Sequence, residues 1–141
     1  MHHDASLTTP NAWRTALDAL VAARMTQPFE WGKQDCCLWA ADCVLASTGI
    51  DHAADVRGTY ADAAGALRVL ARLGGIEAVA ARAGAPIPAL GAGVGDVGLI
   101  VLADRSLLAV CVGAVWLAPG AQGLAARSLG DAVQAWRVDR G

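Results

Sequence analysis

The chain has 141 residues, a formal net charge of −2, 55% hydrophobic residues and 17% charged residues. This length suits a single domain with a core of its own, which we place at residues 10–141 after a short N-terminal extension, 1–9. The charge balance excludes a strongly basic surface of the kind that holds nucleic acid. The longest apolar run, residues 97–103, is far shorter than the roughly 18 residues of a membrane-spanning helix.

Helices are predicted in the first part of the chain, over residues 10–25, 36–48, about 60–73 and 76–83. Thr9 is the expected cap of the first helix. Asp35 should cap the second helix, and Gly49 should end it with a positive φ. Thr59 and Asp62 have the spacing of a capping box for the third helix.

Strands are predicted in the second part of the chain, over residues 97–102, 107–112, 115–117, 124–128 and 136–138. The first two should pair as a hairpin, and Pro119-Gly120 should turn the chain after the third. Helices followed by an antiparallel sheet predict an α+β fold.

Cys36 has the most distinctive chemistry in the chain, because it stands at the predicted start of a helix. Free N–H groups and the positive end of the helix dipole favour an anion there, which lowers a thiol pKa and produces a nucleophilic thiolate. The alternative is a buried cysteine that acts as a small hydrophobic residue. Cys37 and Cys43 have no such argument and are expected in the core.

The cysteines also raise the question of disulfides and metals. Three of the four lie within eight residues, which is poor spacing for a disulfide framework and predicts reduced thiols. Zinc or an iron–sulfur cluster remains a third hypothesis, but the spacing of Cys36, Cys37, Cys43 and Cys111 fits no standard ligand pattern. We therefore expect no metal and no cofactor.

The segment 28–32, followed by Asp35-Cys36 and an apolar helix, resembles the nucleophile region of NlpC-type cell-wall peptidases. These are papain-fold cysteine enzymes that cut peptide bonds in peptidoglycan. Gly95-Asp96 matches the pair that leads into their first sheet strand. The resemblance implies an NlpC/papain-like fold, with Cys36 as nucleophile and supporting roles for Trp31, Gly32, Asp35 and Asp96.

A closer resemblance is to a compact family of phage and prophage proteins related to these enzymes. Its motifs read here as Trp31 to Cys36, Ala40 to Val44, Thr48-Gly49, Ala53 to Tyr60, Gly65 to Arg68, Gly95-Asp96, Cys111 to Gly113, Gly123-Leu124 and Trp136 to Val138. Members resemble tail proteins encoded near the tail-tip genes. The resemblance implies tail-hub or baseplate partners and a place in the virion.

The enzyme family also needs a histidine that takes the proton of the cysteine and later protonates the leaving amine. It begins the strand after the Gly-Asp strand, and Leu107 stands at that position here. The histidines of the chain are His2, His3 and His52. The first two lie near the N-terminus, and His52 is expected in a solvated loop near the far end of the Cys36 helix.

Other residues are candidates for binding a partner. Arg57 should either fix its loop by pairing with Asp42 or Asp55, or face a neighbouring subunit together with Tyr60. Trp116 and Trp136, on short predicted strands, are candidate interface aromatics.

The leading hypothesis is a structural component of a phage tail tip or baseplate hub with a degenerate NlpC-like catalytic centre. The alternative is an active cysteine peptidase or amidase that cleaves peptidoglycan peptides during DNA entry, with Cys36 as nucleophile. An intracellular metal or redox module is the third.

Overall fold

Two helices come first in the computed structural model, which describes residues 11–140. Helix α2 spans Ala12–Arg24 and helix α3 spans Cys36–Thr48, as predicted. The Asp35 side chain accepts a hydrogen bond from the Leu38 N–H, and Gly49 ends α3 with φ 82°, so both predicted caps are confirmed. The predicted extension 1–9 and the cap Thr9 lie outside the described residues.

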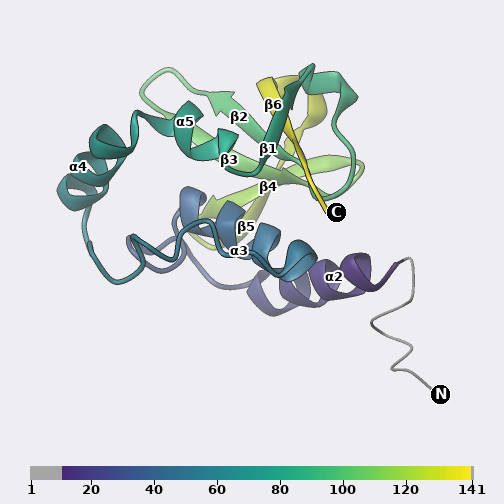
Figure 1. Cartoon of the computed structure of the whole chain (residues 1–141), viewed down its shortest axis with the longest axis horizontal. Coiled ribbons are helices and arrows are strands. Elements are labelled where there is room, and N and C mark those ends of the chain that lie inside the picture. The colour runs from purple at the N-terminus through teal and green to yellow at the C-terminus, as the bar shows by residue number, and fades with distance from the viewer. Residues whose placement is uncertain (1–10, 141) are drawn as a thin grey trace.

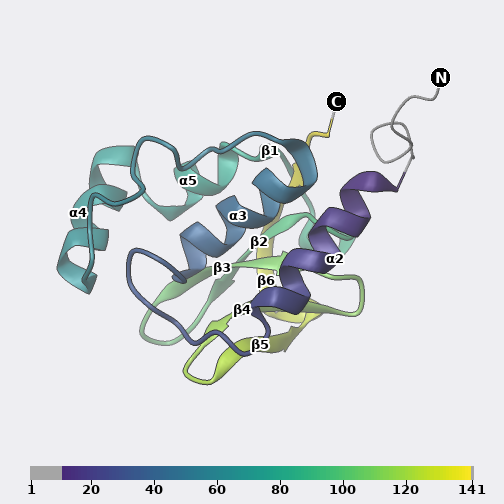
Figure 2. The same cartoon turned by 90° about the horizontal axis from the view of Figure 1, so that it is seen from below.

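Helices α4 (Ala63–Leu73) and α5 (Ile76–Ala81) follow after a turn-rich loop. The predicted capping box is wrong, because the helix begins only at residue 63. Asp62 is therefore the N-cap and accepts the Gly65 N–H at 2.7 Å, while the Thr59 hydroxyl donates to the Val56 carbonyl in the preceding turn. Helix α4 lies at one end of the molecule, beyond α5 and away from the strands (Figures 1 and 2).

The second half of the described chain forms a six-stranded antiparallel sheet of order β1-β6-β2-β3-β4-β5, which confirms the α+β prediction. The strands are β1 Gly84–Ile87, β2 Val97–Val101, β3 Ser106–Cys111, β4 Val115–Gly120, β5 Gly123–Ser128 and β6 Ala132–Val138, with short 3₁₀ turns η1 Ala89–Gly91 and η2 Leu129–Asp131.

Two strand features differ from the sequence prediction. Strand β1 was not predicted, and Pro119-Gly120 lies within β4 instead of forming a turn. Strand β1 is an edge strand, and at Pro119 strand β3 no longer pairs with β4. Proline is tolerated at such open edges, so it does not end the strand.

The sheet buries side chains on both faces. One cluster lies between the helices and the sheet and includes Trp39, Leu108 and Trp136. The other, which we call the far-face cluster, includes Trp116, Leu107 and Ile100 and packs against residues of η1.

The two strand tryptophans belong to these clusters, which corrects their prediction as interface aromatics. Trp116 is fully buried and Trp136 is 4% exposed. The Trp116 ring lies over Gly98, where a Cβ would come within 2.6 Å of it, and its N–H donates to the Leu129 carbonyl at 3.0 Å. Both tryptophans are therefore core residues of the sheet, although other strand residues, such as Val133, are exposed.

An ion-pair network holds the loop after α3 against the helices. The Arg57 guanidinium contacts Asp42 of α3 at 2.6 Å and Asp51 at 2.9 Å, and Arg24 of α2 contacts Asp42 at 2.8 Å. Asp42 is thus confirmed as a partner of Arg57, whereas Asp55 is not its partner. Arg57 has a structural role here, and its contact with another protein stays a prediction.

Asp55 pairs instead with Arg82 at 3.1 Å, next to the C-terminus of α5. Among residues 11–140, no helix is long and apolar enough to cross a membrane.

Candidate functional site

The loop before α3 fixes the position of Cys36. Gly32 has φ +80°, and a Cβ at this residue would overlap the backbone carbonyl oxygen of Tyr60. Its N–H donates to Asp35 Oδ2 at 3.0 Å. The turn therefore needs glycine both for its backbone conformation and for the close approach of the segment that carries Tyr60.

Asp35 connects this turn to the helix and to the distant Tyr60. Its carboxylate is 2% exposed and accepts hydrogen bonds from the Leu38 N–H at 2.9 Å, the Gly32 N–H and the Tyr60 hydroxyl at 2.5 Å. Burial and the nearby carboxylate raise the pKa of Tyr60, so its hydroxyl stays protonated and able to donate. These contacts place Cys36 at the first residue of α3.

The thiols of Cys36 and Cys37, the first two residues of α3, interact through a hydrogen bond. A hydrogen bond from the Cys37 thiol lowers the pKa of Cys36, and the Leu108 N–H and the Arg105 charge lower it further against the effects of burial and Asp35. The same thiol contact and burial raise the pKa of Cys37. Cys36 is therefore the group that ionises, with Cys37 as the neutral donor.

Cys37 packs against the core, as predicted, but it is half-buried and also lines a cavity beside Cys36. Its position in the first helical turn, next to the free N–H groups, is the signal that could have identified it. Cys43 is 1% exposed, as predicted, and burial raises its pKa. Within residues 11–140, no three His, Cys, Asp or Glu side chains come together to hold a metal ion.

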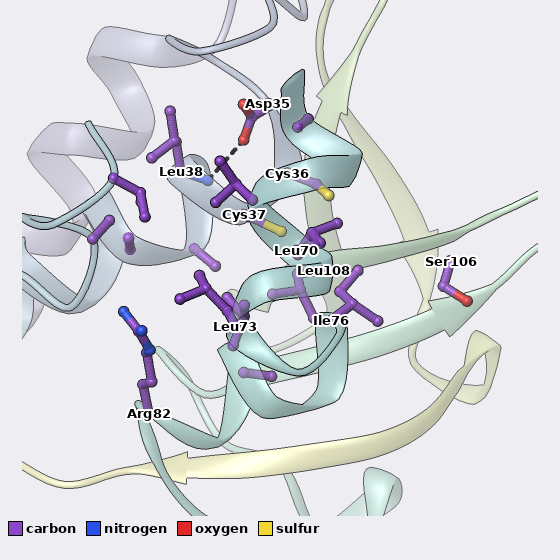
Figure 3. A pocket seen from close by; sticks show the side chains of 18 of the residues that line it. Asp35, Cys36, Cys37, Leu38, Leu70, Leu73, Ile76, Arg82, Ser106 and Leu108 are labelled. Atoms are coloured by element: carbon purple, nitrogen blue, oxygen red, sulfur yellow. Dashed lines mark hydrogen bonds between the residues drawn. The ribbon is translucent and has the colours of Figure 1, made fainter. Parts of the chain in front are cut away.

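The cavity has a volume of about 350 Å³ and lies between α3, α4, α5 and the start of β3. Its walls are largely apolar and include Leu38, Leu70, Leu73, Ile76 and Leu108. Figure 3 shows Asp35, Cys36 and Cys37 together in one part of the site and Arg82 well away from them, with leucine and isoleucine side chains between. Trp31, 40% exposed, also lines the cavity and packs edge-on against Phe29 at 4.7 Å.

The start of strand β3, residues 106–108, lies next to Cys36. Leu107 belongs to the far-face cluster, against which Cys36 also packs, and Ser106 and Leu108 line the cavity. Strand β4 pairs with β3 only at Val110 and Cys111. This leaves the edge of β3 open where the Leu108 N–H reaches the Cys36 sulfur.

His52 lines the same cavity but lies after the C-terminal end of α3. The 13 residues of α3 separate the two ends of that helix by about 18–20 Å. The histidine lies in the loop near the far end of α3, as predicted; it is half-buried, and its backbone carbonyl accepts a hydrogen bond from Arg82 at 2.7 Å. His2 and His3 lie outside the described residues.

Asp96, predicted as a supporting residue, is a structural acceptor that does not line the cavity. It is 1% exposed and accepts the N–H groups of Gly93 at 2.8 Å and Val138 at 3.0 Å, together with the Arg137 Nε at 3.0 Å. It joins the loop before β2 to the end of β6.

A cysteine at the first residue of a helix that packs on an antiparallel sheet is the arrangement expected of an NlpC-like α+β fold. Comparison with solved structures supports this fold with the crystal structure of the NlpC/p60 domain of peptidoglycan hydrolase SagA. The TM-score is 0.59 and the identity 17%, over 88% of this chain and 97% of that chain. The likeness confirms the predicted NlpC-like fold.

The family follows from a sequence model described as "Domain of unknown function (DUF6950)", which matches residues 8–138. The chain belongs to this family. No curated protein sequence matches it.

Proposed function

We propose that this chain is a structural component of a bacteriophage tail tip or baseplate hub, built on an NlpC-like fold whose peptidase centre has degenerated. The observation that carries the proposal is the pair of side chains that β3 presents to the Cys36 cavity. Ser106 and Leu108 stand there, and neither can accept a proton from a thiol and return it to a leaving amine near neutral pH.

The missing proton transfer should hinder cleavage of a peptide bond more than formation of the Cys36 thiolate. A thiolate forms at the α3 start without a base, but an amide leaves as an amine only when it is protonated. Loss of one member of a catalytic set costs several orders of magnitude in rate. The motifs shared with phage tail proteins, from Trp31-Gly32 to Trp136-Arg137-Val138, support a role in assembly.

The assembly role is tested with purified phage particles or tails from a strain that encodes the chain. Quantitative mass spectrometry should find it in tails at a fixed ratio to the hub proteins, and deleting its gene should produce incomplete tails. Complete tails that lack the protein, with unchanged assembly after deletion, would overturn the proposal.

The alternative is a cysteine peptidase or amidase that opens peptidoglycan, and the lowered pKa of Cys36 is the observation that favours it. Purified protein is incubated with muropeptides, with Cys36→Ala as the test variant and His52→Ala as the matched control. We expect no turnover. Turnover by the native chain that is lost in Cys36→Ala would establish the enzyme. If His52→Ala also lost that turnover, His52 would be identified as a base that moves to the thiol.

A further inference from the structure

The cavity beside Cys36 has a shape and lining that the proposed assembly role does not use. Its volume of about 350 Å³ lies within the roughly 300–1,000 Å³ range of small-molecule sites. Apolar side chains of three helices and the sheet line it, including Val44, Val69 and Leu73. Such a lining suits a flexible hydrocarbon chain better than a peptide, whose amide groups need hydrogen-bond partners.

The nucleophile lies at one end of the cavity, and other polar lining residues, Arg82 and His52, lie well away from it. Along α3, the lining residues run from Cys36 to Val44, a distance of about 12 Å at the helical rise. Cys36, Cys37 and Asp35 lie at the start of this path, and the following side chains are apolar (Figure 3). A ligand with a reactive polar end and an apolar tail fits this order.

We propose that this cavity binds a medium-length acyl chain and that Cys36 accepts the acyl group from a thioester. The Cys36 thiolate adds to the thioester carbonyl, a new carbon–sulfur bond forms, and the bond to the donor sulfur breaks. The donor leaves as a thiolate, which takes a proton from water. One thioester replaces another, without oxidation or reduction.

This reaction uses the Cys36 thiolate and does not need a proton donor for the leaving group. A thiolate leaves without prior protonation, so the reaction does not need a proton donor on the described residues of β3 beside Cys36. The N–H groups of Leu38 and Trp39 donate to Asp35, which leaves those of Cys36 and Cys37 at the start of α3 to bind the oxyanion of the addition step. Hydrolysis of the product is slow, because the described residues of β3 beside the sulfur, Ser106, Leu107 and Leu108, cannot act as a base that activates water. The expected outcome is one stable acyl group on each chain, independent of any assembly role.

The test compares octanoyl and acetyl thioesters of N-acetylcysteamine with the full-length chain, followed by intact-mass and peptide mass spectrometry. We expect a single octanoyl adduct on Cys36 that forms at least about tenfold faster than the acetyl adduct, since the longer chain buries additional methylenes. Equal rates for the two donors, or an adduct that persists in Cys36→Ala, would overturn the proposal.

A cavity-filling variant separates the chain-binding site from the nucleophile. Ala66 of α4 lines the cavity and is 7% exposed. Ala66→Phe should remove the preference for octanoyl and leave acetyl transfer to Cys36 within about twofold. An unchanged preference in this variant would contradict the assigned cavity.

Binding without chemistry provides a check that does not depend on the folding of Ala66→Phe. Octanoate is titrated into Cys36→Ala and followed by the NMR signal of the Trp31 indole, which lines the cavity. We expect a saturable shift that acetate does not produce. No shift up to millimolar octanoate would refute the acyl-binding cavity.

Discussion

Replacing Asp35 is expected to destabilise the fold far more than the loss of an ordinary helix cap. Asp35→Ala removes the acceptor of three donors, which are the N–H groups of Leu38 and Gly32 and the hydroxyl of Tyr60. An N-cap contributes about 0.5–2 kcal/mol, and each buried donor left without a partner costs about 1–3 kcal/mol. Allowing for partial relaxation, we expect a loss of about 3–5 kcal/mol in the free energy of unfolding.

The matched control is Asp62→Ala at the start of α4. Asp62 is an exposed cap that accepts one N–H, from Gly65, so its loss should cost about 1 kcal/mol. Equilibrium unfolding in urea measures both variants. Where Asp35→Ala is too unstable to purify, a double-mutant cycle of Asp35→Asn with Tyr60→Phe measures the coupling, expected above about 0.5 kcal/mol. Equal losses for the two alanine variants would refute the argument that Asp35 connects three segments.

Three further predictions concern the thiols, a turn and acid. The rate of Cys36 alkylation should show a pKa below the usual thiol value of about 8.5, and Cys37→Ala should raise that pKa because a hydrogen-bond donor is lost; an inflection at or above 8.5 contradicts this. Gly32→Ala should cost several kcal/mol, against about 1–2 kcal/mol for Gly58→Ala, which has φ +77° in open space; equal urea midpoints would refute the close approach. The hydrogen bond from the Arg57 guanidinium lowers the pKa of Asp51 in the folded chain. The stabilisation by this carboxylate is therefore present above the ordinary Asp pKa and is lost as the pH falls through the lower folded value. As the pH is lowered below about 4, the urea midpoint of unfolding should fall less in Asp51→Asn than in the native chain.

The features predicted correctly from the sequence are those with local causes. The limits of α3 follow from the chemistry of one capping carboxylate and one glycine with positive φ, so Asp35 and Gly49 were sufficient to place them. Strands β2 and β3 follow from apolar runs joined by a short turn. The predicted capping box of α4 also rested on the local sequence, and it was wrong. Of Thr59 and Asp62, only Asp62 stands directly before the helix and caps it.

The features that were missed depend on distant parts of the chain. Strand β1 pairs only with β6, about 50 residues later, and four residues that include a proline carry no signal of that pairing. Leu107 lies in the cluster against which Cys36 packs, whereas its neighbours Ser106 and Leu108 line the cavity, because strand side chains alternate between the faces of the sheet. The cavity forms because α4 and α5 lie beside α3, so neither its volume nor the role of Cys37 follows from helical periodicity.

The position of β6 in the sheet has a consequence for how the chain folds. This strand is formed by residues 132–138, yet it lies between β1 and β2, and within residues 11–140 it is the only strand that pairs with β1. During synthesis, β1 and α5 therefore emerge long before the partner that completes the sheet, and only the β2–β5 meander can form early. Closure requires contacts between residues far apart in sequence, which are slow to form. Until then the edges of β1 and β2 are exposed to pairing with other chains, which makes synthesis the stage at which this domain is most open to aggregation or to a chaperone.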